Sequence, residues 1–193
     1  MPAAKKTAAK KAPAKKAPAK KSSSSSRGSS SGGARDAIAL LKADHKEVNG
    51  LFKEYEKMAD AEADAEERQT LAEQICDMLT VHATIEEEIF YPAARESEVD
   101  SDLLDEAEVE HASAKDLIAQ IKGMSPDDEL YDAKVKVLGE YVNHHVQEEE
   151  GEMFPKARRA KVDLAGLAEQ LKQRKEQLMS ESGAMAGNGM AAK

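Results

Sequence analysis

The sequence contains no tryptophan, and aromatic residues make up only 4% of it. Its single cysteine, Cys76, cannot form a disulfide within the chain, which favours a reducing compartment such as the cytoplasm. No apolar run reaches the length of about eighteen residues that a transmembrane helix needs, and the N-terminus lacks the apolar stretch of a secretory signal. Alanine, leucine, glutamate and lysine are abundant, which is typical of a helical bundle.

Charge is divided unevenly along the chain. The net charge is −9, but residues 1–35 contain ten of the 28 basic residues and no acidic residue. The rest of the chain holds the other 18 basic residues and all 37 acidic ones, a net charge of −19. Two segments of opposite charge in one chain indicate two different roles.

The basic segment repeats a five-residue unit built on paired lysines: AAKKT, AAKKA, PAKKA and PAKKS, over residues 3–22. Prolines interrupt any helix there, and few apolar side chains offset the entropy of ordering, so residues 1–35 are predicted to form a disordered tail with a Ser/Gly linker. The lysine pairs resemble the tails of linker histones and of some bacterial nucleoid-associated proteins. That resemblance implies nucleic acid as a partner of residues 1–35, bound through phosphates; an anionic membrane, or no partner beyond the acidic bundle, is the alternative.

The rest of the sequence predicts an all-α fold, with a helical domain over residues 36–180 and a disordered C-terminus over 181–193. A helix from 125 to 159 has the clearest start, with Ser125 as cap and Pro126 at the first position. The weakest point of the second helix is Pro92. The five predicted helices cover residues 36–58, 66–96, 102–123, 125–159 and 163–180.

Two segments repeat one pattern of polar and aromatic residues. HATIEEEIFYP (82–92) and HVQEEEGEMFP (145–155) each have a histidine, glutamates four and five residues later, an aromatic residue and a proline. His45 and His111 also correspond, because each follows an acidic residue and precedes a methionine by thirteen residues. Two helix-pair repeats predict an antiparallel, up-down-up-down four-helix bundle with pseudo-twofold symmetry and a fifth helix at its C-terminal end.

Helical spacing places the polar residues of these repeats on apolar stripes. The stripes are Ile38, Leu41, His45, Val48 and Phe52; Ile75, Leu79, His82, Glu86 and Phe90; Leu104, Ala107, His111, Ala114 and Ile118; and Leu138, Val142, His145, Glu149 and Met153. Four histidines and two glutamates are therefore expected to point into one core.

One histidine on an apolar stripe is usually a core residue bonded to a carbonyl, and a histidine–glutamate pair can lie on a helix surface. Four inward histidines with two inward glutamates in matched repeats are poorly explained that way. Buried carboxylates without partners cost several kcal/mol, and metal cations between them remove that cost. The neighbouring glutamates, Glu87, Glu88, Glu148, Glu150 and Glu152, are interpreted mostly as surface charge.

The two segments resemble the signature segments of the bacterial hemerythrin-like, HHE cation-binding domain family, over roughly residues 36–180. The resemblance implies two non-haem iron ions, bridged by oxygen and by two glutamates; manganese or zinc would also fit imidazole and carboxylate ligands. By position, it implies these ligands: His45, His82, Glu86, His111, His145 and Glu149.

The sequence departs from oxygen-carrying hemerythrins at two places. Lys115 stands where they have a second histidine, four residues after His111, and both Glu149 and Glu150 are available where they have an aspartate. His144 is a further candidate, although it lies about 100° around the helix from His145. Fewer protein ligands would leave the centre more open to solvent, which puts simple reversible oxygen carriage in doubt.

Three functions follow from these residues. The first is a metal-binding module that binds or senses oxygen or iron. The second is a di-iron enzyme that consumes peroxide or nitric oxide, and the sequence does not decide between the two. The third is association with nucleic acid through the tail. The chain is expected to be a monomer or a weak oligomer.

Overall fold

The computed structural model describes residues 36–188, with side chains to residue 181, and every regular element among them is helical. The prediction of an all-α fold is therefore confirmed, while the basic tail lies outside the described residues. The elements are α1 (Ala37–Asp60), α2 (Ala65–Ile85), η1 (Glu86–Phe90), α3 (Tyr91–Glu96), α4 (Ser101–Lys122), α5 (Tyr131–Glu148), η2 (Glu149–Met153), α6 (Phe154–Ala160) and α7 (Leu164–Asn188).

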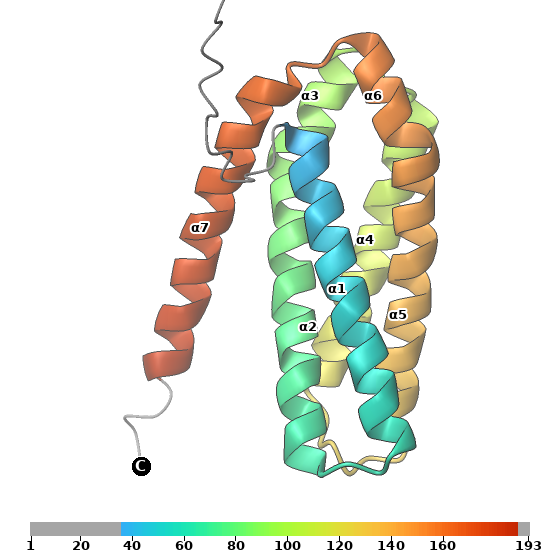
Figure 1. The fold of residues 1–193 in the computed structure, drawn as a ribbon, viewed down its shortest axis with the longest axis vertical. Helices are drawn as coiled ribbons and strands as arrows, with labels where there is room; N and C mark the ends of the chain where they lie inside the picture. The colour runs from blue at the N-terminus through green and yellow to red at the C-terminus, as the bar shows by residue number, and fades with distance from the viewer. Residues whose placement is uncertain (1–35, 189–193) are drawn as a thin grey trace, which may run out of the picture. The chain divides into compact units, whose positions relative to one another are not determined.

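The helices α1, α2, α4 and α5 form an antiparallel bundle (Figure 1). Helix α1 packs against α2 and α5, and α4 packs against the same two helices, so the two repeats lie face to face. Helix α7 lies outside the bundle, against α1 and α2. None of the described helices is long and apolar enough to cross a membrane.

Aspartates begin three of the bundle helices. Asp36 accepts a hydrogen bond from the backbone N–H of Ala39, and Asp64 and Asp100 do the same for residues 66 and 102. Each aspartate satisfies one of the backbone donors that a helix leaves free in its first turn, and its charge faces the positive end of the helix.

The predicted start of the fourth bundle helix at Ser125 is wrong, since α5 begins at Tyr131. Ser125 does accept a hydrogen bond from the N–H of Asp127, but Asp128 turns back to accept one from Ser125. The segment therefore forms consecutive turns. Helix α5 begins at Tyr131, whose side chain is buried in the core.

The second and fourth bundle helices contain a wider, π-helical turn, which the sequence analysis did not predict. In η1 the N–H of Tyr91 donates to the carbonyl of Glu86, five residues back, and in η2 Phe154 donates to Glu149 in the same way. Pro92 and Pro155 follow directly. A proline has no N–H to donate and its ring crowds the carbonyl four residues back, so a widened turn before it relieves the conflict.

The C-terminal helix also differs from the prediction. Helix α7 continues to Asn188, eight residues past the predicted end and into the segment assigned to a disordered terminus. Residues such as Ala184, Met185 and Ala186 favour helix, and they outweigh the unfavourable Gly183 and Gly187 on either side of them.

Two apolar clusters fill the bundle, one at each end. The first joins residues such as Leu41, Phe90 and Leu104, with Leu171 of α7 packed against them. The second, toward the other end, includes Val48, Tyr55 and Leu71. The predicted polar stripe residues lie between these two clusters.

Candidate metal centre

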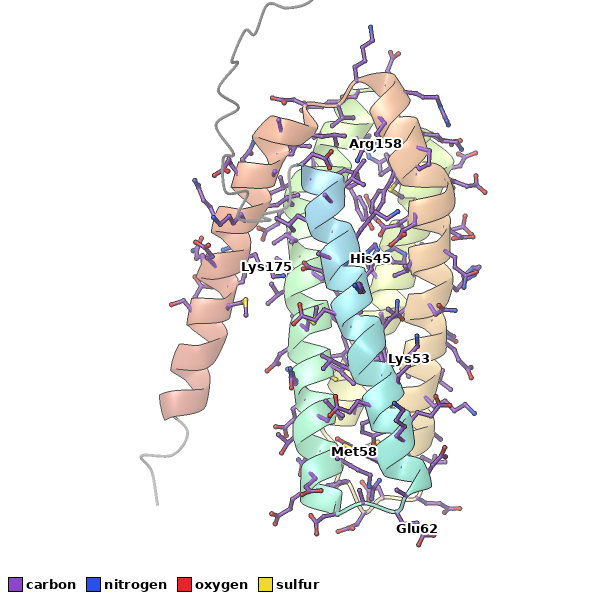
Figure 2. All side chains as sticks on the ribbon, viewed as in Figure 1. His45, Lys53, Met58, Glu62, Arg158 and Lys175 are labelled. Carbon is purple, nitrogen blue, oxygen red and sulfur yellow. The ribbon has the colours of Figure 1, made fainter. Side chains whose placement is uncertain are left out.

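A layer of buried polar side chains separates the two apolar clusters. All four stripe histidines are at most 8% exposed, and the two glutamates that open the π-helical turns are at most 1% exposed. Figure 2 shows His45 in the half of the bundle nearer Arg158 than Glu62. The inward register predicted for all six residues is thus confirmed, and the buried layer consists of His45, His82, Glu86, His111, His145 and Glu149.

The histidines form two pairs through their Nε2 atoms. Nε2 of His45 lies 3.0 Å from Nε2 of His82, and Nε2 of His111 lies 3.1 Å from Nε2 of His145. Each pair joins the lone histidine of one helix to the signature histidine of the next, so each repeat supplies one pair. Two nitrogens that bind one ion at about 2.1 Å in adjacent positions lie about 3 Å apart, which the pairs match.

The two glutamates lie between the pairs. Oε2 of Glu86 is 3.2 Å from Nε2 of His82 and 3.5 Å from Nε2 of His111, so one carboxylate reaches both pairs. Oε2 of Glu149 is 3.2 Å from Nε2 of His45 and 3.5 Å from Nε2 of His145. The buried layer therefore holds two groups of donors that could bind a metal, and they share Glu86.

The donor set fits metal ions better than it fits an ordinary polar core. Both oxygens of Glu86 and Oε2 of Glu149 are buried and accept no hydrogen bond among the described residues. Facing Nε2 atoms repel each other if both carry lone pairs, so each pair needs a proton or a cation between its members. Cations bound by the nitrogens and by the free carboxylate oxygens would satisfy all of these atoms.

Carboxylates on the outer side of the rings orient the histidines. Oε1 of Glu87 lies 2.9 Å from Nδ1 of His111, and Oε1 of Glu150 lies 3.0 Å from Nδ1 of His45. An ionised carboxylate only accepts hydrogen bonds, so Nδ1 carries the hydrogen and the Nε2 lone pair faces the centre.

The signature histidines have outer carboxylates as well. Oε2 of Glu110 lies 2.8 Å from Nδ1 of His145, whereas Asp44 is 3.6 Å from Nδ1 of His82. Interpreting Glu87 and Glu150 as surface charge was therefore incomplete. Their matched positions directly after Glu86 and Glu149 were the available signal.

Burial and mutual charge drive the pKa values of the two central glutamates apart. Burial raises the pKa of Glu86, and the nearby charge of Glu149 raises it further, to well above the usual value. Burial also opposes ionisation of Glu149, but His145 and His45 outweigh it and lower its pKa to about 2. In the metal-free protein, Glu86 therefore holds a proton more strongly than Glu149 does.

The histidine pKa values diverge too. Burial lowers the pKa of His82, and burial with the neighbouring His145 lowers the pKa of His111 to about 4. Burial lowers the pKa of His145 as well, but Glu149 and Glu110 outweigh it and the net shift is upward. His145 is thus the ring that a proton occupies first within its pair.

One buried residue near the centre breaks the symmetry between the repeats. The hydroxyl of Tyr91 donates to Oε1 of Glu149 at 3.0 Å and lies 3.3 Å from Nε2 of His111. Its counterpart is Phe154, whose ring stacks on His45 at 5.8 Å. The sequence pattern predicted only an aromatic residue at both positions, and the difference between tyrosine and phenylalanine is the signal that could have indicated the asymmetry.

The two residues left open by the sequence lie outside the buried layer. Lys115 is half-exposed, and its Nζ donates to Oε1 of Glu87 at 2.7 Å. It therefore acts on His111 through Glu87 and does not enter the nitrogen cluster. His144 is exposed, with its Nε2 3.6 Å from Glu110. Glu149 faces the Nε2 atoms of the buried histidines, whereas Glu150 contacts the outer Nδ1 of His45.

A cavity of about 40 Å³ adjoins the four histidines. Apart from these rings it is walled largely by aliphatic side chains of both repeats, including Val48, Ile118 and Val142. The volume has room for a molecule of one or two heavy atoms beside the centre. An apolar wall at the centre favours a small uncharged ligand over an organic substrate.

The fold and the site together define a four-helix bundle protein with a buried histidine–glutamate centre of the kind that binds metal cations. The hemerythrin HHE cation binding domain family matches residues 36–182, and the chain belongs to that family.

Two other comparisons extend this result. A DNA nickase of Nostoc sp. is 34% identical over 115 residues, which are 60% of this chain and 31% of that protein. This chain therefore spans about a third of that relative's length. A crystal structure of a hemerythrin HHE cation binding domain-containing protein from Mycobacterium kansasii has a TM-score of 0.63 at 24% identity. The structural match covers 76% of this chain and 88% of that protein's chain, and it supports a shared fold.

Proposed function

We propose that the bundle binds two non-haem iron ions and, at them, a small molecule such as oxygen, peroxide or nitric oxide. The buried, unpartnered oxygens of Glu86, set between two histidine pairs, carry this proposal. Each pair would hold one ion, and Glu86 and Glu149 would reach both. Imidazole and carboxylate donors suit iron, and manganese or zinc would fit the same set less specifically.

The protein supplies fewer donors than two six-coordinate ions accept. Four ring nitrogens and four carboxylate oxygens make eight donor atoms, so positions remain for solvent and for a small ligand. Bound iron would supply redox chemistry toward oxygen species at those positions. The chain's own residues orient the rings through their outer carboxylates, exclude bulk water with two apolar clusters and offer the Tyr91 hydroxyl as a donor beside Glu149.

Metal analysis of the purified protein tests this proposal. Iron-loaded protein is expected to contain close to two iron atoms per chain, and His82→Ala or Glu86→Ala should lower that content sharply. The variant Glu152→Gln is a matched control, because Glu152 is an exposed η2 residue whose one ion pair within residues 36–181 is with Lys156. Full iron content in both site variants would disprove the ligand assignment.

A peroxide assay separates the binding module from the enzyme. A catalyst consumes many equivalents of peroxide per chain, whereas a binding or sensing protein reacts with about as many as it has sites. We favour binding, because the cavity beside the four histidines is small and is walled largely by aliphatic side chains. Turnover that scales with iron content would instead assign the enzyme function.

A second function, nucleic-acid binding through residues 1–35, is favoured by the charge of +10 in that segment and by the Nostoc relative described as a DNA nickase. If the eight paired lysines all contact phosphates, the logarithm of the binding constant should fall with log salt at a slope of up to about −7. Deleting residues 1–35 should abolish DNA binding and leave the iron content unchanged. Binding that survives the deletion would exclude the tail as the DNA-binding segment.

We also infer a cytoplasmic location, which rests on the single, buried Cys76. A reducing compartment keeps such a thiol unpaired.

A further inference from the structure

A second cluster of metal-ligand side chains lies on the surface between α4 and α5. It consists of Glu110 from α4 and of His144 and Glu148, one helical turn apart on α5. Nε2 of His144 lies 3.6 Å from Oε1 of Glu110 and 3.5 Å from Oε1 of Glu148. One donor atom from each residue lies within 4.8 Å of the others. The side chain of His144 is 63% exposed, so solvent reaches this cluster directly.

The matching positions of the first repeat do not carry the same three residues as this surface cluster. Counted from the matched histidines, the counterparts of His144 and Glu148 in the first repeat are Val81 and Ile85, and both are buried. The counterpart of Glu110 is Asp44. Helix α7 covers Asp44, and Nζ of Lys175 donates to its Oδ1 at 2.5 Å. Figure 2 shows Lys175 on the side of α7 that faces the bundle. In the first repeat, this carboxylate is therefore neutralised by a lysine of α7.

The second repeat has no such cation. Among residues 36–181, no lysine or arginine forms an ion pair with Glu110 or Glu148, and the two carboxylates approach each other across His144. One imidazole and two carboxylates with solvent access are a donor set for a borderline divalent ion. A cation there would supply the charge that Lys175 supplies to Asp44.

We propose that Glu110, His144 and Glu148 bind a divalent transition-metal ion of the zinc class, with water in its remaining positions. This site is separate from the buried centre, but one of its residues, Glu110, also contacts a histidine of that centre. Oε1 of Glu110 faces His144, while Oε2 accepts from Nδ1 of His145 at 2.8 Å. The surface ion thus lies one carboxylate away from a buried histidine.

Zinc titration of the iron-loaded full chain tests the proposal. Calorimetry should show one zinc equivalent bound without release of iron. Residues 1–35 contain no histidine, cysteine or acidic residue, so that segment offers no competing side-chain ligands. His144→Ala and Glu148→Gln should each weaken zinc binding by about tenfold or more, because each removes one of three protein ligands.

The exposed position of His144 makes an effect of its replacement on folding small, and helical melting of the variants checks this. Glu152→Gln, an exposed glutamate on the following turn, is the matched control and should bind zinc like the unaltered chain. Zinc affinity unchanged in both site variants would overturn the proposal. So would zinc uptake accompanied by an equivalent loss of iron, because that is exchange into the buried centre.

Discussion

Glu87 and His111 form a hydrogen bond of 2.9 Å on the side of the ring that faces away from the buried centre. Lys115 contacts the same carboxylate, and Lys42 contacts Glu150 in the other repeat at 2.8 Å. In each case a lysine and a histidine of one repeat thus share a glutamate of the other repeat. The lysines come from different positions of the repeat, so the bundle builds the same support twice from different sequence.

Removing the charge of this support should weaken metal binding without unfolding the protein. We expect Glu87→Gln to lower iron affinity by about 10- to 100-fold, because a neutral amide holds the Nδ1 hydrogen of His111 less strongly and can present the wrong group to it. Chelator competition measures the change, with Glu152→Gln as control. Equal affinities in the two variants would show that Glu87 does not support the metal ligand.

Glu86→Gln should raise the stability of the metal-free protein at pH 7 while it lowers iron binding. The pKa of Glu86 is raised well above its usual value, chiefly by burial and then by Glu149. At neutral pH the unfolded chain releases that proton and gains free energy, so this group's contribution is lost as pH rises through the folded pKa. Glutamine carries no such penalty, and Nε2 of His82 is close enough to accept its N–H.

Thermal melting of metal-free Glu86→Gln and of the exposed control Glu169→Gln measures this effect. A melting temperature below that of the unaltered protein would mean that the buried carboxyl is not a source of instability.

Iron affinity should fall as the pH is lowered from about 8 to 5. The pKa of His145 is raised, since Glu149 and Glu110 outweigh burial, so a proton competes for this ring already near neutral pH. His111, with a pKa of about 4, adds competition only near the acid end. Binding requires neutral imidazoles, so the stabilisation that iron confers is present at high pH and is lost on acidification. Chelator competition at successive pH values should reveal this slope; affinity that stays constant to pH 5 would contradict it.

Lys175→Met should destabilise the protein by about 1–3 kcal/mol, because it leaves the buried Asp44 without its ammonium partner. Burial raises the pKa of Asp44, but His82 and Lys175 outweigh it and the net pKa is lowered. That contribution is present above the unfolded pKa of about 3.9 and lost as pH falls through the folded pKa, so the variant should differ most at neutral pH. Urea unfolding measures the difference, with the exposed Lys172→Met as control. Equal losses in both would show that the contact with Asp44 contributes nothing.

The substitution Tyr91→Phe gives the first repeat the aromatic residue that the second repeat has at the matching position, Phe154. The metal-free variant should lose about 1.5–3 kcal/mol of unfolding free energy, because Glu149 loses a buried hydrogen bond to a charged acceptor. Tyr131→Phe is the control, since Tyr131 is equally buried and no hydrogen bond of its hydroxyl is found among the described residues. If the two variants lose the same free energy, the hydroxyl of Tyr91 is not anchored at Glu149.

The sequence alone determined the helical class, the two repeats and the inward direction of six polar residues. Helical periodicity is a local property, and a histidine that recurs on an apolar stripe such as Leu41–His45–Val48 must enter the core when the helix packs. The family could be identified from the two signature segments for the same reason. Each segment lies within one predicted helix, so the spacing of its histidine and glutamates can be recognised in the sequence.

Only the tertiary structure decided which partners those residues have. Glu87 and Glu150 look like solvated charges along the chain, yet they reach histidines 24 and 105 residues away. The π-helical turns and the late start of α5 also depended on packing, since a proline or a serine cap is compatible with several local geometries. Contacts between distant helices arise from how the helices pack around a shared core, and no periodicity within one helix encodes them.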